Sequence, residues 1–234
     1  MPAVVDLIHV KRDGGTLSAD EVRWLIGAYT RGEIADEQMS ALLTAMDVPL
    51  GRAVGNALEV EESVAVLRGQ GPPDLVEVTL ALAREMLALA GIDADPAAAL
   101  ADGRALKAYR EMIAGQDGDP DAELAQAAVT EVVTAPASGW LRRLDARAVG
   151  VAAWRLGAGR ARKEDPVSAA AGIVCLAKPG EQVEAGQPIL ELRADRDSVL
   201  PDAKAALFGP GGAGAIEIGP EPLAVSPMII DRIS

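Results

Sequence analysis

The feature that most constrains the fold is a change of pattern at residues 115–121, whose sequence is GQDGDPD. Before this stretch, apolar residues recur with helical spacing, and after it short apolar runs alternate with turn residues. Glycine, proline and aspartate interrupt regular structure, so the stretch is a turn or linker. The sequence therefore predicts helices before this boundary and an α+β domain after it.

Two short helices are predicted near the amino terminus. The first starts at a capping box, in which Ser18 and Glu21 satisfy each other's backbone N–H groups, and the second starts after Asp36. Neither helix can bury a core alone, so we expect both to pack on the rest of the chain or on a second subunit. The residues on their apolar faces are Val22, Leu25, Ile26, Tyr29, Met39, Leu42, Leu43 and Met46.

The remaining elements follow from periodicity and turn residues. Asp74, with Glu77 as its capping partner, is expected to cap a helix that runs to Ala90, and Asp95-Pro96 to start another that runs to about Ala114. Further helices are predicted at 53–67, 145–156 and 201–208, and strands at 131–134, 173–176, 182–183, 188–192 and 213–218.

Composition excludes several classes of protein. The formal net charge of −13 disfavours nucleic acid or an anionic membrane as a partner, because such binding needs Lys and Arg. The most apolar helix, 75–92, contains three charged residues and is too polar to span a bilayer. The single cysteine, Cys175, lies in an apolar run and is interpreted as a structural thiol. With no signal peptide apparent in residues 1–11, we expect a cytoplasmic protein.

The stretch 50–62 raises a question of ligand chemistry, because a glycine-punctuated turn there opens a helix. A phosphate cradle usually has Lys, Ser or Thr beside it, but this stretch has only Arg52, and Glu59, Glu61 and Glu62 would repel an anion. Backbone carbonyls near a carboxylate suit a hard cation instead. Taken alone, the residues favour a simple turn followed by a helix with a solvated acidic face.

Other candidates for chemistry are weak. His9 is the only histidine and lies in an apolar segment, which favours a structural role. The basic loop 155–163 is interpreted as a charged loop docked on a neighbouring lobe, and Asp145 and Arg147 as residues that cap and solvate a helix. No metal-binding CxxC or HExxH motif and no Walker motif occurs. We therefore assign no catalytic and no cofactor-binding residue.

Several motifs together resemble the thymidine phosphorylase and pyrimidine-nucleoside phosphorylase family. They are VDLI at 5–8, KRDGG at 11–15, QMSALL at 38–43, PLGRAVGNALEV at 49–60, DARAVG at 145–150, GAGR at 157–160, DPV at 165–167 and PGEQVEAGQPILEL at 179–192. The resemblance implies a mixed α/β and α+β fold. The resemblance further implies three parts: a helical dimerisation lobe at 1–46, a reduced helix-rich remnant of an α/β phosphorylase domain at 47–115, and a hammerhead-like α+β domain at 122–234.

The resemblance also implies an activity and a defect. The family cleaves a pyrimidine nucleoside with phosphate to give the free base and a pentose 1-phosphate, which makes it a pentosyltransferase. Its phosphate loop, of Lys-His-Ser-Thr-Gly-Gly type, and its base-binding residues lie in a segment that has no counterpart here. We hypothesise an internal deletion joined near Leu42–Met46. We expect a chain that is inactive alone, with helices at 53–114 that expose apolar surface.

By the same resemblance, the 50–62 stretch corresponds to half of the family's potassium-like cation site. The matching ligands are the carbonyls of Leu50 and Ala53 and the carboxylate of Glu62. Because the other half belongs to the absent phosphate loop, we expect only weak binding of a monovalent cation, and no cofactor is required.

Two alternatives of other classes stay open. One is a non-catalytic oligomerisation remnant, a homodimer formed through the amino-terminal helices. The other is a biotinyl- or lipoyl-like carrier module, with Lys178 as the modified residue, although Lys178 lacks the flanking Met typical of such lysines. If the chain were active, the cleft would have to be rebuilt from residues such as Arg52, Arg160 and Lys163.

Overall fold

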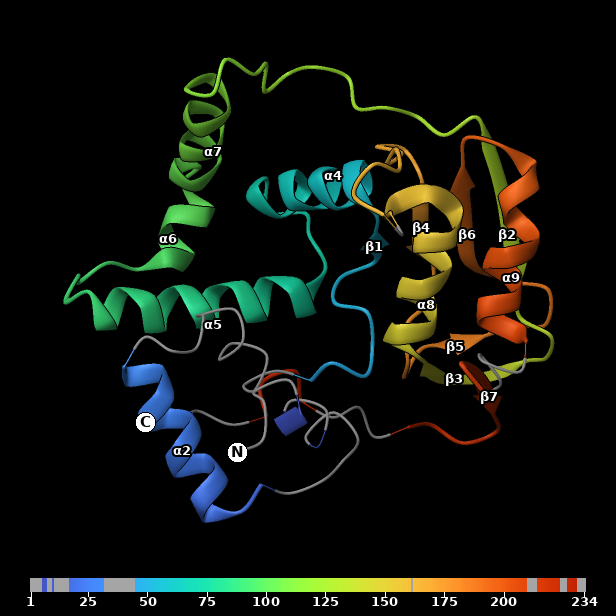
Figure 1. Cartoon of the computed structure of the whole chain (residues 1–234), viewed down its shortest axis with the longest axis horizontal. Helices are drawn as coiled ribbons and strands as arrows, with labels where there is room; N and C mark the ends of the chain where they lie inside the picture. The colour runs from blue at the N-terminus through green and yellow to red at the C-terminus, as the bar shows by residue number, and fades with distance from the viewer. Residues whose placement is uncertain are drawn as a thin grey trace. The chain divides into compact units, whose positions relative to one another are not determined.

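The structure is a computed structural model that describes residues 6–7, 10, 17–31, 45–160, 162–209, 214–223 and 227–230. The chain forms two compact units, one of residues 1–47 with 226–234 and one of residues 48–225 (Figure 1). His9 and the helix predicted after Asp36 lie outside the described residues, apart from Met46.

Helix α2, Ala19–Thr30, belongs to the first unit. The predicted capping box is confirmed at its start: Glu21 N–H donates to Ser18 Oγ at 3.2 Å, and Ser18 N–H donates to the Glu21 carboxylate at 2.7 Å. Leu25 and Ala28 are buried. In the same unit, Ala45 N–H donates to the Met228 carbonyl at 2.9 Å, which ties the two stretches of chain together.

The second unit contains a four-stranded antiparallel sheet in the order β1-β4-β6-β2 (Figure 1). Its strands are β1 Ala53–Val54, β2 Val129–Thr134, β4 Gly172–Cys175 and β6 Pro188–Ala194. Strands β4 and β6 are central and largely buried, as expected for near-continuous apolar runs. Residues of β2 alternate between partly buried and exposed, as expected at a sheet edge.

A second sheet of three antiparallel strands has the order β5-β3-β7. It contains β3 Gly139–Leu144, β5 Gln182–Val183 and β7 Ile216–Gly219. Helices α8 Ala146–Ala153 and α9 Leu200–Phe208 pack on each other, and their buried residues share one apolar core with both sheets. The turn Trp154–Ala158 continues α8 and bends at Gly157, whose φ is +115°, and a short 3-10 turn, Asp197–Val199, leads into α9.

Strand β3 was not predicted from sequence. Its residues, GWLRRL, include two adjacent arginines, and the register with β7 shifts between Leu141 and Arg143. The shift places Leu141 and Leu144 in the core, three positions apart, so the strand lacks the simple alternation that marks a half-buried strand.

The helix predicted at 53–67 is helix α4, but it starts later, at Asn56–Leu67. Ala53 and Val54 instead form β1 and pair with Val174 and Ile173 of β4. Gly55 separates the two elements with φ +143°, a conformation that a helix cannot include. The prediction was wrong at this end because the pairing with β4 overrides helical periodicity.

The following helices are α5 Pro73–Leu89, α6 Pro96–Ala101 and α7 Arg104–Ala114. Asp95 caps α6 by accepting from Ala97 N–H at 2.9 Å, as predicted. The single helix predicted after Asp95 is divided, because Gly103 adopts φ +83° and starts α7.

These three helices bury little of their surface. Helices α6 and α7 contain no buried residue, and Met86 of α5 and Met112 of α7 are 69% and 52% exposed. Among the described residues, no helix is long and apolar enough to cross a membrane. The molecule therefore combines helices and antiparallel sheets, as the predicted mixed fold class requires, with a well-packed carboxy-terminal core and sparsely packed helices before it.

Candidate functional site

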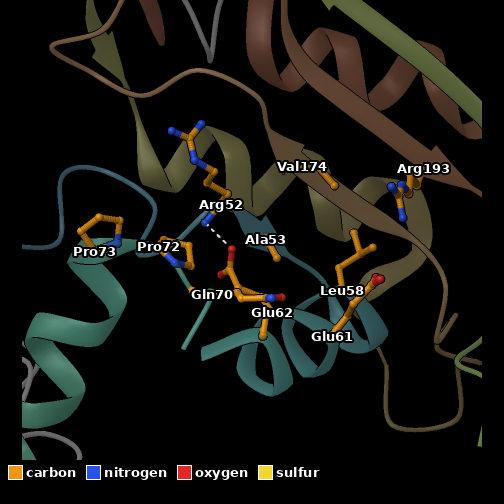
Figure 2. Close-up of a pocket in the computed structure, with 12 residues that line it drawn as sticks. Arg52, Ala53, Leu58, Glu61, Glu62, Gln70, Pro72, Pro73, Val174 and Arg193 are labelled. Carbon is orange, nitrogen blue, oxygen red and sulfur yellow. Dashed lines mark hydrogen bonds between the residues drawn. The ribbon is translucent and has the colours of Figure 1, made fainter. Parts of the chain in front are cut away.

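A pocket of about 490 Å³ lies in the second unit, beside the turn that the sequence singled out (Figure 2). Helix α4 and the α4–α5 connection form one side, and β1, β4 and β6 contribute the other. The lining residues are Arg52, Ala53, Leu58, Glu61, Glu62, Ala65, Gln70, Gly71, Pro72, Pro73, Val174 and Arg193.

Two glycines set the local backbone of the turn at 49–55. Gly51 has φ +66°, and a Cβ atom there would collide with the Glu62 carboxylate. Gly55 has φ +143°, and a Cβ atom there would collide with the backbone of Ala171 and Gly172. Only glycine meets both demands, so these positions fix the turn against α4 and β4.

The charge of Arg52 is used within the protein. Its guanidinium donates to the carbonyls of Cys175 and Leu176 at 3.2 and 2.9 Å and pairs with Glu181. Figure 2 shows the guanidinium pointing away from Glu62, while the Arg52 N–H donates to Glu62 Oε1 at 2.8 Å. The second arginine of the pocket, Arg193, pairs with Glu191 at 2.6 Å. Both arginines of the pocket therefore already have acidic partners.

Asp74 does not cap α5, so that prediction is corrected. Asp74 is the second residue of the helix. The N-cap position belongs to Pro72, which makes no side-chain capping hydrogen bond. The Asp74 carboxylate instead accepts from Gly51 N–H at 3.2 Å and pairs with Lys178 at 3.0 Å. The contacts with Gly51 and Lys178 are favoured over a capping hydrogen bond, because they give a partly buried carboxylate a positively charged partner.

The three residues predicted as cation ligands lie close along the chain but differ in surroundings. Ala53 is in β1 and Glu62 is on α4, and both line the pocket, whereas Leu50 is 40% exposed. The Glu62 carboxylate is held by the Arg52 N–H. Across the described residues, no group of three or more His, Cys, Asp or Glu side chains is placed to hold a metal. The site through Leu50, Ala53 and Glu62 stays a prediction.

The basic loop after α8 is docked by Asn56. The Asn56 Nδ2 group donates to the carbonyls of Ala158 and Ser168 at 2.9 and 3.0 Å. Arg160 donates to the Lys163 carbonyl at 3.2 Å, and neither residue lines the pocket. This is the docked charged loop that the sequence predicted.

Asp145 and Cys175 have structural roles. Asp145 caps α8 by accepting from Ala148 N–H at 2.8 Å, as predicted. Burial raises its pKa, but hydrogen bonds from Ala148 and Arg143 outweigh burial, so that the pKa lies below its ordinary value. Cys175 is fully buried in β4, and burial raises the pKa of its thiol to about 11. A thiol in that environment is a poor nucleophile.

Sequence reasoning missed the contacts that bring the turn at 49–55 together with the connection between β4 and β5. Lys178 and Glu181, both on that connection, bind the turn through Pro49, Gly51 and Arg52. The partners lie more than a hundred positions apart, and no periodicity links them. The one local signal was the spacing of Lys178 and Glu181 across Pro-Gly, which is suited to a tight turn.

Two parts of the chain match known families. Residues 5–48 match the helical bundle domain of a glycosyl transferase family, and residues 140–208 match the carboxy-terminal domain of pyrimidine nucleoside phosphorylase. These two matches define the class of protein to which the chain is similar, a glycosyl transferase family.

Curated relatives narrow this class. Thymidine phosphorylase of Mycobacterium tuberculosis (strain ATCC 25618 / H37Rv) is 49% identical over 194 residues, which cover 82% of this chain and 44% of the relative. Pyrimidine-nucleoside phosphorylase of Bacillus subtilis (strain 168) is 39% identical over 208 residues, 82% of this chain and 48% of the relative. The chain belongs to the thymidine and pyrimidine-nucleoside phosphorylase family, and the matches span about half the length of these relatives.

Proposed function

We propose that this chain is a partial pyrimidine-nucleoside phosphorylase that catalyses no phosphorolysis on its own. The parent reaction places phosphate below the sugar C1 and stabilises the negative charge of the leaving base, and both tasks need cationic or hydrogen-bonding groups in a cleft. One observation carries the proposal: both arginines of the pocket are paired with Glu181 and Glu191, while Glu61 and Glu62 line the same space. A pocket of this charge disfavours phosphate.

We attribute the lack of phosphorolysis to an internal deletion near Leu42–Met46. The match to the relatives covers 82% of the chain, so about 18% of 234 residues, or about 42, lie outside it. This number is close to the 44 residues of the helical bundle match, 5–48. An unmatched stretch of this length is expected when two parts of this chain correspond to parts of a relative that are far apart in its sequence. The source gene tests this, because an in-frame middle segment at codons 42–46 would contradict an encoded deletion.

The direct test of ligand binding is calorimetric titration of the chain with inorganic phosphate and, separately, with thymidine. We expect no saturable heat for either ligand up to millimolar concentration, whereas a full-length relative measured alongside binds both. Micromolar binding of phosphate by this chain would contradict the proposal, and would direct attention to Arg52, Arg160 and Lys163.

The cation site is part of the same proposal. The carbonyls of Leu50 and Ala53 with the Glu62 carboxylate form half of a monovalent-cation site and bind potassium only weakly, since three ligands leave much of the ion's shell to water. Measuring the melting temperature in potassium and choline chloride at equal ionic strength tests this. We expect Glu62→Gln to leave the difference between the two salts unchanged. A potassium-specific stabilisation that this substitution removes would show an occupied site.

The family's architecture suggests a second role, an oligomerisation scaffold. We propose the domain division 1–46, 47–115 and 122–234 and a homodimer formed through the helices of the first domain, in a cytoplasmic protein. The match of residues 5–48 to a helical bundle domain supports this role. Sedimentation equilibrium tests it: we expect a dimer at micromolar concentration, and a monomer at all concentrations would contradict it.

The carrier alternative is disfavoured by the contacts of Lys178. A carrier lysine is exposed on a hairpin, whereas this side chain is 14% exposed and paired with Asp74. We expect an intact mass without a biotinyl or lipoyl adduct, even after incubation with the corresponding ligase.

A further inference from the structure

The ammonium group of Lys178 is surrounded by three oxygen atoms from other segments of the chain. It donates to the carbonyl of Pro49 and, at 2.6 Å, to the carbonyl of Gly51, and it pairs with Asp74 Oδ2 at 3.0 Å. The Lys178 and Asp74 side chains are only 14% and 21% exposed. Two backbone carbonyls and one carboxylate are the oxygen ligands that a small hard cation prefers in proteins.

The three oxygens need a positive charge between them. Asp74 also accepts from Gly51 N–H at 3.2 Å, so that one carboxylate oxygen bridges the turn and the ammonium. Carbonyl oxygens and a carboxylate that converge on one point repel one another. Without a cation, the Asp74 carboxylate would stay half-buried with no positive partner. Leaving one charge of a buried pair uncompensated strongly destabilises the folded state.

The lysine is held in place from its own side. Lys178 N–H donates to Glu181 Oε2 at 3.0 Å across the turn that joins β4 to β5. The other oxygen of Glu181 pairs with Arg52, the residue next to Gly51. The backbone that carries the ammonium is therefore fixed to the same turn that supplies its carbonyl ligands.

We propose that Lys178 acts as a tethered cation: its ammonium group occupies a monovalent-cation site formed by the carbonyls of Pro49 and Gly51 and the carboxylate of Asp74. This site differs from the half-site proposed above, which uses the carbonyls of Leu50 and Ala53 and the carboxylate of Glu62. The two sites share no ligand, although Leu50 lies between Pro49 and Gly51 in the sequence. The tethered charge fixes the turn without a dissolved metal. When the ammonium is removed, K⁺ or Rb⁺ at molar concentration can occupy the same site, although three oxygens bind either ion only weakly. The inference does not depend on phosphorolysis.

The test is the melting temperature of Lys178→Met, measured in choline chloride and then in potassium or rubidium chloride at equal ionic strength. In choline we expect a loss of about 5 °C or more, since a half-buried charge pair is broken in a chain of this size. We expect molar potassium to restore a measurable part of the loss, while the parent chain responds equally to both salts. The matched control is Lys204→Met, because Lys204 binds a single carboxylate, that of Glu131 at 2.8 Å, and is 43% exposed.

Two results would overturn the proposal. The first is a loss no larger than that of Lys204→Met, and the second is a large loss that potassium and rubidium do not restore. A measurement on the parent chain decides the matter if Lys178→Met does not fold. During reductive methylation of the folded protein, we expect Lys107, which is 75% exposed, to be modified at least ten times faster than Lys178. Equal rates would show that the ammonium is not enclosed.

Discussion

The guanidinium of Arg52 and the carboxylate of Glu181 form an ion pair that connects the turn before β1 to the turn between β4 and β5. The two side chains are 38% and 43% exposed, so water screens the pair. The pair contributes mainly by positioning the turn, because the same guanidinium also donates to the carbonyls of Cys175 and Leu176. The turn that lines the pocket is thus held by hydrogen bonds to β4 and to the segment that follows it.

Substitution Glu181→Gln should lower the free energy of unfolding by about 0.5–1 kcal/mol, the range of a partly exposed ion pair. Because exposed charges are screened by salt, the difference from the parent should shrink in 1 M NaCl. Urea unfolding at low and high salt measures both effects. Glu184→Gln, an exposed position just after β5, is the control and should change little. A loss that is independent of salt would mean that the pair acts through packing.

Substitution Gly51→Ala should be more destabilising than Gly69→Ala. Both glycines have positive φ, +66° and +77°, so each variant bears a backbone strain of about 1–2 kcal/mol. Only at Gly51 would the new Cβ atom also meet the Glu62 carboxylate, whereas at Gly69 nothing lies within 4 Å. We expect Gly51→Ala to cost at least about 1 kcal/mol more in urea unfolding. Equal losses would show that Glu62 moves aside freely.

Substitution Asn56→Asp separates two opposing effects at the start of α4. A carboxylate there gains about 0.3–1 kcal/mol from the helix dipole, but it cannot donate to the carbonyls of Ala158 and Ser168. Loss of two hydrogen bonds costs about 1–3 kcal/mol, so we expect a net loss. The loss should shrink at pH 3–4, where the introduced carboxyl group is protonated. A variant more stable than the parent at pH 7 would mean that the dipole outweighs the tether.

Cys175 should make the protein sensitive to alkali. Its pKa is raised by burial to about 11 in the folded state, against an ordinary value near 9. The folded thiol therefore keeps its proton where the unfolded one loses it, and stability is fully present below pH 9 and lost as the pH rises toward 11. We expect a loss of up to about 3 kcal/mol across that range, which Cys175→Ala should lack. A chromogenic disulfide reagent should react with Cys175 only after unfolding. Rapid reaction with the folded chain at pH 8 would contradict this account.

Much of the fold could be predicted, because elements with strong local signals formed where expected. The Ser18–Glu21 capping box, the Asp95 and Asp145 caps, and strands β2 and β6 all followed from residue type and spacing. The failures occurred where tertiary contacts override local preference. Pairing with β4 made Ala53 and Val54 a strand, and a register shift concealed β3.

The site was harder to predict for the same reason. The sequence located the turn at 50–62 and showed that it lacks the groups that hold phosphate. It could not show that Lys178 and Asp74 meet at this turn, because charge pairs far apart in sequence leave no pattern. Asp74 was predicted as a cap because capping is the commonest local use of an aspartate before a helix.

The central claim is that this chain has the family's framework without its chemistry. The most direct measurement is release of thymine from thymidine and phosphate, followed by ultraviolet absorbance with micromolar purified chain, beside a full-length relative at nanomolar concentration. We predict no release above the rate without enzyme, and rapid release by the relative. Release that requires phosphate and scales with the amount of this chain would contradict the claim.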